Sequence, residues 1–164
     1  MRRLLPLGLA LAAAACTTPA PPPKVAPAPP VPTVVPPPAT GDLGALPATA
    51  GTWPDVADAA GSSAPFGPPG AAPAFTIACR QGRIALSRAG GQAGTMTVTT
   101  SDGPTSWPSG MERGAATVLL AARDPFLDRL AFSRGRFTVE LPGTAELVVP
   151  AWAEPARVIE DCRG

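Results

Sequence analysis

The side chains of this chain that could perform acid–base chemistry are carboxylates, because the sequence of 164 residues contains no histidine. The absence of histidine excludes Ser-His and Cys-His catalysis as well as imidazole-ligated metals. Two neighbouring carboxylates can still hydrolyse a glycan when one acts as the acid and the other as the base or nucleophile. Three pairs are close enough in sequence to be candidates: Asp124 with Asp128, Glu140 with Glu146, and Glu160 with Asp161.

Each of these pairs also has an explanation that involves no catalysis. Asp124 precedes Pro125, which is typical of a helix N-cap. The second pair flanks a predicted hairpin turn, and the third lies on the polar face of a predicted helix.

The serines lack a base, because the only lysine, Lys24, lies in a proline-rich segment. No glycine-rich phosphate loop or clustered metal-ligand spacing is present. We therefore predict no catalytic residues, no cofactor and no metal.

Arginine is the polar residue whose use is unusual, since the chain from Phe75 onward has ten arginines and no lysine. Arg134 and Arg136 stand on either side of Gly135, and a guanidinium group binds a carboxylate or phosphate through two hydrogen bonds. These two arginines are candidate contacts for an acidic partner, such as peptidoglycan carboxylates or lipid phosphates. The alternative is a solvated surface on which arginine replaces lysine, as a GC-rich genome would encode.

Two of the three tryptophans, Trp107 and Trp152, are expected to have different roles. Trp107 lies in a proline-flanked segment and is a further candidate for a ligand contact. Trp152 directly precedes a predicted C-terminal helix, so we expect it to cover the core rather than to form a ligand platform.

Cys16 is the residue whose chemistry the sequence indicates most directly. A basic start, Met1-Arg2-Arg3, is followed by an apolar run from Leu4 to Ala15, which is the layout of a secretory signal. This run is shorter than the roughly 20 residues that a transmembrane helix needs. Its end, Leu-Ala-Ala-Ala-Ala-Cys, resembles a bacterial lipobox, so we predict a signal peptide at residues 1–15 and lipidation of Cys16. A plain signal-peptidase cut that leaves Cys16 free is the alternative.

The other two cysteines are expected to pair with each other. The chain has three cysteines, and assigning Cys16 to lipid leaves Cys79 and Cys162. An exported compartment is oxidising, so these two should form a disulfide that links the start of the folded part to its end. The alternative is a pair of buried free thiols.

Residues 16–49 are predicted to be a disordered, proline-rich tether. Of the 24 prolines, 11 lie between Pro19 and Pro38, and each one fixes φ and removes a backbone donor. Such a segment favours extended polyproline II, which suits a spacer between a membrane and one domain at residues 50–164. A ligand for a proline-recognition module is the alternative.

The domain is predicted to be mainly β (α+β), a small antiparallel sheet or sandwich with a short C-terminal helix. Alternation of apolar and polar residues favours strands. Such alternation is found at residues 75–79, 84–88, 95–99, 137–141 and 147–149, and a further strand is expected at residues 115–122. Gln81-Gly82 is expected to form a turn after residues 75–79, and Pro142-Gly143 a type II turn between residues 137–141 and 147–149. The segment Val118-Leu119-Leu120 is apolar at successive positions, which predicts a central or doubly covered strand. Trp53 and Phe66 are expected to belong to a first pair of edge strands, giving six to eight strands in all.

Helix signals are present at two places. Asp124-Pro125 predicts one or two helical turns with Leu127 and Leu130 facing inward. Apolar residues at helical spacing predict a terminal helix whose Cys162 points toward the core.

Several motifs together resemble those of small alphaproteobacterial lipoproteins. They are Gly51-x-Trp53, Ala64-x-Phe66-Gly67, Phe75-x-Ile77-x-Cys79, Ser133-Arg134-Gly135-Arg136-Phe137, Leu147-x-x-Pro150-x-Trp152-x-Glu154 and the run from Arg157 to Arg163. The resemblance covers most of residues 51–163 and is most specific in the last third. It implies an envelope lipoprotein with a disulfide, and it implies no activity.

The function expected from the sequence is that of a lipid-anchored module on the periplasmic side of the cell envelope, most simply at the outer membrane. Its partner would be an envelope protein or peptidoglycan. Nucleic acid is not expected, because 13 basic residues against 12 acidic ones create no attracting field. The alternative function is inhibition of a secreted hydrolase such as lysozyme.

Overall fold

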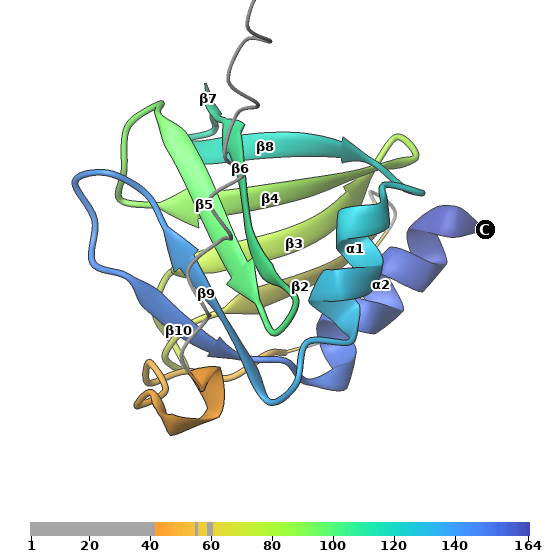
Figure 1. Cartoon of the computed structure of the whole chain (residues 1–164). Coiled ribbons are helices and arrows are strands. Elements are labelled where there is room, and N and C mark those ends of the chain that lie inside the picture. The colour runs from red at the N-terminus through yellow and green to blue at the C-terminus, as the bar shows by residue number, and fades with distance from the viewer. Residues whose placement is uncertain (1–41, 55, 59–60) are drawn as a thin grey trace, which may run out of the picture. The chain divides into compact units, whose positions relative to one another are not determined.

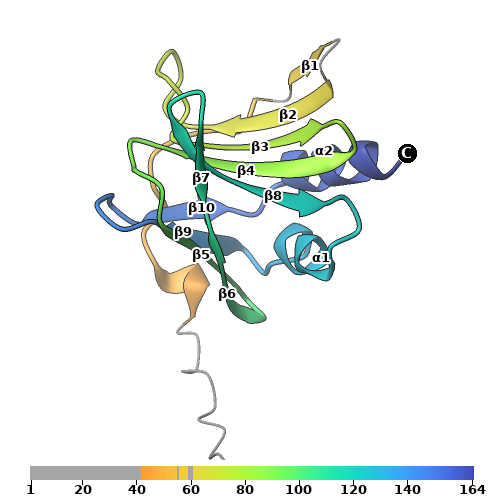
Figure 2. The same ribbon diagram turned by 90° about the horizontal axis from the view of Figure 1, so that it is seen from above.

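Ten β-strands in two antiparallel sheets build the fold, which confirms the mainly β prediction. The structure is a computed structural model and describes residues 42–54, 56–58 and 61–164. The predicted signal peptide, Cys16 and residues 16–41 of the predicted tether lie outside these residues. Figures 1 and 2 show the two sheets packed face to face, with both helices at one end.

The larger sheet has six strands in the order β1-β2-β3-β4-β8-β7. They are β1 (Val56–Asp58), β2 (Gly61–Phe66), β3 (Phe75–Arg80), β4 (Arg83–Ala89), β7 (Gly110–Glu112) and β8 (Ala115–Ala121). The predicted turn at Gln81-Gly82 joins β3 to β4 and places Arg80 directly opposite Arg83. The two edge strands, β1 and β7, are short, so neither presents a long unpaired edge.

The smaller sheet has four strands in the order β10-β9-β5-β6. They are β5 (Thr95–Thr100), β6 (Gly103–Pro108), β9 (Arg136–Glu140) and β10 (Leu147–Pro150). The predicted hairpin with Pro142-Gly143 at its turn is confirmed as the β9–β10 pair. Gly143 has φ +81, and the Thr144 N–H donates to the Leu141 carbonyl, as the predicted type II turn requires.

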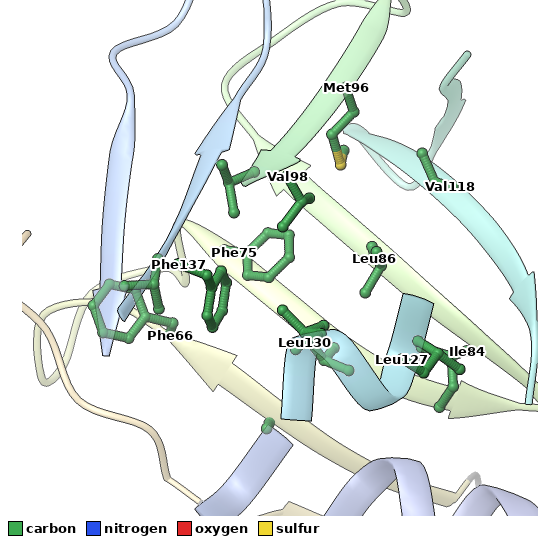
Figure 3. Close-up of a cluster of buried hydrophobic side chains, with 14 of the residues drawn as sticks. Phe66, Phe75, Ile84, Leu86, Met96, Val98, Val118, Leu127, Leu130 and Phe137 are labelled. Carbon is green, nitrogen blue, oxygen red and sulfur yellow. The ribbon is translucent and has the colours of Figure 1, made fainter. Parts of the chain in front are cut away.

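The core lies between the two sheets and is made of the apolar residues that alternate along the strands. Figure 3 shows aromatic and aliphatic side chains from both sheets meeting α1 in one cluster. Phe66, Phe75 and Phe137 are each at most 1% exposed, and Phe75 and Phe137 pack edge to face with their ring centroids 6.2 Å apart. The period-two pattern therefore identified the inward face of these strands correctly.

Two strand predictions need correction. Leu119 in β8 is 38% exposed, so this strand buries one face and is not covered on both. Its neighbours are β4 and the three-residue β7, which places it one position from the sheet edge. Phe66 belongs to β2, which is an internal strand, and the edge position is taken by β1. The strand count exceeds six to eight because β6 and β7 were missed: Gly103-Pro104 in β6 favours a turn, and the three residues of β7 are too few to show alternation.

Helix α1 (Pro125–Ala131) begins as the sequence predicts. The Asp124 carboxylate accepts a hydrogen bond from the Phe126 N–H at 2.9 Å, and Pro125 stands at the first helical position. Leu127 and Leu130 are at most 1% exposed and face the core. No helix in the described part of the chain combines the length and apolar character needed to cross a membrane.

Asp124→Ala is expected to lower the free energy of unfolding by about 1 kcal/mol, because a helix-terminal N–H loses its acceptor. Asp124→Asn keeps a capping oxygen and should remain within about 0.5 kcal/mol of the wild type. Urea unfolding followed by circular dichroism measures both values. Equal losses in the two variants would show that the cap does not account for the effect.

Helix α2 (Ala153–Arg163) closes the same end of the fold as α1. Val158 and Ile159 are at most 1% exposed and join the core, while the Arg163 guanidinium lies 2.8 Å from the Asp128 carboxylate of α1. Cys162 is joined to Cys79 of β3 in a disulfide, with the Cα atoms 5.3 Å apart. The predicted pairing and the predicted position of the helix are both confirmed.

The folded part begins earlier than residue 50, the predicted boundary. A short 3-10 helix, η1 (Leu43–Ala45), buries Leu43, and the Thr49 N–H donates to the Val148 carbonyl of β10 at 2.9 Å. Arg136 also holds this segment, through a hydrogen bond to the Gly44 carbonyl. Residues 42–49 contain proline and alanine, as the tether does, but hydrogen bonds to distant parts of the chain hold them in the fold.

Candidate functional site

A groove of about 850 Å³ lies on the outer face of the six-stranded sheet, opposite the core. The alternation of side chains along β3 explains why the groove lies on this face. Phe75 and Ile77 point inward, so Thr76 and Ala78, which alternate with them, point outward. The same rule turns Leu119 outward between Val118 and Leu120. The lining residues are Gly61, Ser62, Ser63, Thr76, Ala78, Cys79, Arg80, Gln81, Arg83, Glu112, Arg113 and Leu119.

The floor of the groove is made of small side chains. Ser63 in β2 pairs with Ala78 in β3, and Ala78 pairs in turn with Ala85 in β4, whose next neighbour is Leu119. A row of small residues lets a ligand approach the backbone of the sheet closely. Leu119 adds one exposed apolar side chain, so the floor is apolar at one end and carries the Ser63 hydroxyl at the other.

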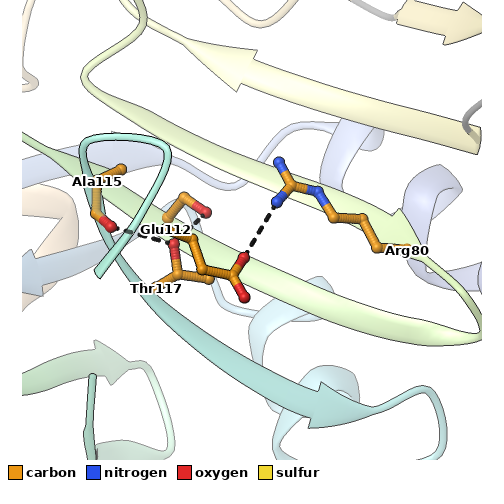
Figure 4. A network of polar contacts seen from close by, with 5 residues as sticks. Arg80, Glu112, Ala115 and Thr117 are labelled. Atoms are coloured by element: carbon orange, nitrogen blue, oxygen red, sulfur yellow. Dashed lines mark hydrogen bonds and ion pairs between the residues drawn. The ribbon is translucent and has the colours of Figure 1, made fainter. Parts of the chain in front are cut away.

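Charged side chains stand around this floor, and arginines outnumber carboxylates among them. Arg80 donates to the Glu112 carboxylate at 3.3 Å, which links β3 to β7 across the two strands between them (Figure 4). The Arg83 guanidinium donates to the Leu119 carbonyl at 2.9 Å. With Arg113, three lining arginines face one lining glutamate, so the groove carries a net positive charge.

Two hairpin tips at the rim of the groove have an unusual backbone. Gln81 has φ 52 and Arg113 has φ 50, and they are the non-glycine residues with positive φ in the described part of the chain. Each is followed by a glycine with positive φ, as in a type I′ turn, where asparagine, aspartate or glycine is preferred at the first position. Long side chains in this conformation cost of order 1 kcal/mol, and such positions cluster at binding sites.

Among the predicted ligand contacts, neither Arg134 nor Arg136 lines this groove. Arg136 is half-buried, and its bond to the Gly44 carbonyl gives it a role in holding the start of the fold. Arg134 is exposed at the loop between α1 and β9, where its N–H donates to the Ser101 hydroxyl. Arg134 and Arg136, the two arginines predicted from the sequence, therefore make different contacts, and neither belongs to the groove.

Trp107 was predicted to contact a ligand and Trp152 to cover the core, but the structure shows the reverse pattern of burial. Trp107 belongs to β6 and packs edge to face on Phe126, with the ring centroids 4.5 Å apart. Trp152 is 49% exposed, so the prediction that it covers the core is wrong. The alternation in β6 turns Trp107 toward Phe126 of α1, whereas Trp152 is the N-cap residue of α2 and its side chain makes no capping hydrogen bond.

The paired carboxylates occupy the positions that their structural explanations require. Asp124 caps α1 and Asp128 pairs with Arg163, while Glu160 and Asp161 are exposed on α2. Glu140 and Glu146 are exposed beside a smaller cavity of about 390 Å³ around the Pro142-Gly143 turn. In the part of the chain that the structure describes, no three metal-binding side chains gather into one cluster.

One arginine is buried and serves the fold. Arg88 is 8% exposed and donates to the carbonyls of Ala74, Ala89 and Ala145, which ties the end of β4 to the residues that precede β3 and β10. Burial in this environment lowers the pKa of the Arg88 guanidinium from its ordinary value. Its outward-facing neighbours in β4 are Ser87 and Ala89, so Arg88 does not contribute charge to the groove.

Sequence reasoning noted the excess of arginine but did not identify the arginines that converge. Arg80, Arg83 and Arg113 come from two hairpins about 30 residues apart. One local signal was available, since Arg80-Gln81-Gly82-Arg83 places two arginines opposite each other across a two-residue turn. The meeting of Arg80 with Glu112 depends on the strand order and could not be read from the sequence.

No family model, curated protein or solved structure matches this chain. The functional proposal therefore depends on the sequence signals and on the groove.

Proposed function

We propose that this protein is a cell-envelope lipoprotein, held at a membrane by acyl chains on Cys16, whose folded unit binds a ligand in the outer groove. The single observation that carries the binding role is the groove itself. It combines an open floor of small residues with three arginines and a rim where two non-glycine residues adopt the left-handed conformation. Pockets of this volume accommodate a ligand of a few residues or a drug-sized molecule.

The membrane-anchoring part of the proposal is supported by the sequence. A charged start, a short apolar run and small residues before Cys16 match the pattern of a lipidated signal. Two or three acyl chains give lasting attachment, since each buried CH₂ contributes about 0.8 kcal/mol. The periplasmic side of the envelope is an oxidising compartment, which agrees with the disulfide between Cys79 and Cys162.

Cys16→Ala is expected to abolish incorporation of a palmitate analogue, because the acylated thiol is removed. Labelling in the native bacterial host, followed by immunoprecipitation and gel fluorescence, measures the incorporation. Cys162→Ala serves as the control and should label like the wild type, since this cysteine lies in the folded unit. Equal labelling of Cys16→Ala and the wild type would contradict the anchor.

The binding role is tested by filling the groove. Ser63→Trp places a large side chain on the floor, whereas Ala93→Trp places the same side chain in an exposed loop outside the groove. The detergent-extracted full chain would be incubated with purified peptidoglycan and, separately, with envelope extract. Material retained by the wild type and Ala93→Trp but lost by Ser63→Trp supports the proposal. Retention by all three proteins would contradict it, and groove-dependent capture of a hydrolase would favour the inhibitor function instead.

A further inference from the structure

We propose that the ligand of the outer groove is a short acidic peptide chain whose carboxylates bind Arg80 and Arg83, and that Glu112 occupies the place of one such carboxylate. This inference rests on the proposed binding function of the groove. It adds the chemical class of the ligand and the residue that competes with it.

The charges of the groove favour an anionic ligand. Arg80 and Arg83 are directly opposite each other in the β3–β4 hairpin, so their guanidinium groups start from neighbouring positions on one face. Arg113 stands at the rim, and Glu112 is the only carboxylate among the lining residues. An arginine pair in this arrangement offers more donors than one glutamate can satisfy.

The ion pair within the groove indicates that the anion is a carboxylate. Arg80 already donates to the Glu112 carboxylate at 3.3 Å, so the geometry of the site accommodates this group. Figure 4 shows the two side chains reaching toward each other from different strands. The second guanidinium, on Arg83, donates to the Leu119 carbonyl. A carboxylate of the ligand would be a stronger acceptor for this guanidinium than the neutral carbonyl, because it is charged.

The shape of the groove favours a peptide chain. The floor crosses from β2 to β8 through Ser63, Ala78 and Leu119, and the small side chains of Ser63 and Ala78 leave room above the sheet for an extended chain. The hydroxyls of Ser63 and Thr76 provide hydrogen-bonding groups for peptide units, and Leu119 provides an apolar contact. The volume of about 850 Å³ limits the bound part to a few residues.

A ligand carboxylate can displace the Glu112 carboxylate from Arg80 at little cost in free energy. The side chains of Arg80 and Glu112 are 34% and 43% exposed, and ion pairs between exposed side chains contribute little to stability. Glu112 is also the last residue of β7, a three-residue edge strand whose residues are all exposed. The pair can therefore open without disturbing the core.

The test uses a fluorescein-labelled pentapeptide of alternating glutamate and alanine, titrated against the detergent-extracted full chain at low ionic strength. Glu112→Gln should bind it two- to fivefold more tightly than the wild type, because the competing carboxylate is gone. Arg80→Gln and Arg83→Gln should each bind it about tenfold more weakly, because a charged hydrogen bond is lost. The matched controls, Arg134→Gln and Glu160→Gln, change the same charges outside the groove and should leave the affinity within twofold.

Three outcomes would overturn the inference. The first is the absence of binding at millimolar peptide to both the wild type and Glu112→Gln. The second is weakening by Arg134→Gln equal to that by Arg80→Gln, which would indicate attraction by overall charge. The third is equal binding of the same peptide with glutamine in place of glutamate. If one of these occurs while Ser63→Trp still loses the captured envelope material, the ligand class is wrong and the binding function stands.

Discussion

Replacing both Cys79 and Cys162 by alanine is expected to lower the free energy of unfolding by about 4 kcal/mol. The disulfide closes a loop with a sequence separation of 83 residues, and a cross-link of this span restricts the unfolded chain strongly. A domain of this size has a total stability of about 5–15 kcal/mol, so the loss is a large share of it. Urea unfolding of the oxidised wild type and of the double variant measures the difference.

The reduced wild type provides the control for this experiment, because it removes the cross-link without changing a side chain's volume. It should be destabilised to within about 1 kcal/mol of the double variant. Helix α2 still buries Val158 and Ile159 in both proteins, so the fold should persist in the absence of denaturant. A loss below about 1 kcal/mol, or alkylation of both thiols in the native protein without reductant, would contradict the structural role of the disulfide.

Trp53→Ala is expected to lower the free energy of unfolding by about 4 kcal/mol, the loss typical of a buried aromatic residue. The Trp53 indole is 4% exposed and lies 5.1 Å from the Phe66 ring and 6.4 Å from the Phe137 ring, measured between centroids. Its Nε1–H also donates to the Pro150 carbonyl at 2.9 Å, which joins the first part of the fold to the end of β10. Urea unfolding followed by far-ultraviolet circular dichroism measures the effect without relying on tryptophan fluorescence.

Two further variants separate the contributions of packing and hydrogen bonding. Trp53→Phe keeps much of the apolar contact but loses the indole hydrogen bond to the Pro150 carbonyl, which then accepts only from the Trp152 N–H, so we expect a loss of about 1–2 kcal/mol. Trp152→Ala removes an indole that is 49% exposed and should cost at most about 0.5 kcal/mol. If Trp53→Ala were no more destabilising than Trp152→Ala, residues 42–54 would not be an integral part of the folded unit.

In the proposed function, Cys16 anchors the protein and the folded unit binds the ligand. Acylation of Cys16 would keep the protein at a membrane, and the outer face of the six-stranded sheet would remain available to a ligand, because the core, α1 and α2 lie on the opposite face. Binding at the groove and stability of the fold should therefore vary independently. Charge substitutions at Arg80, Arg83 and Glu112 alter exposed or half-buried side chains and leave the core untouched.

Local structure was predictable wherever neighbouring residues in the chain specify it. The cap at Asp124, the turns at Gln81-Gly82 and Pro142-Gly143, and the inward faces of the strands all depend on residues within a few positions of each other. Backbone preferences and the two periods of 2 and 3.6 residues express these short-range constraints directly. The pairing of Cys79 with Cys162 was predictable for a chemical reason, the cysteine count combined with the expectation of an oxidising compartment.

The groove and the true start of the fold were decided by tertiary structure. Alternation in β3 shows that Arg80 leaves the core, but only the strand order β3-β4-β8-β7 brings Glu112 within reach of it. Residues 42–49 have the composition of a linker, and they are ordered by Val148 and Arg136, about 90–100 positions later in the chain. Sequence patterns report which face of a strand is buried, whereas contacts between distant segments depend on the packing of the whole chain.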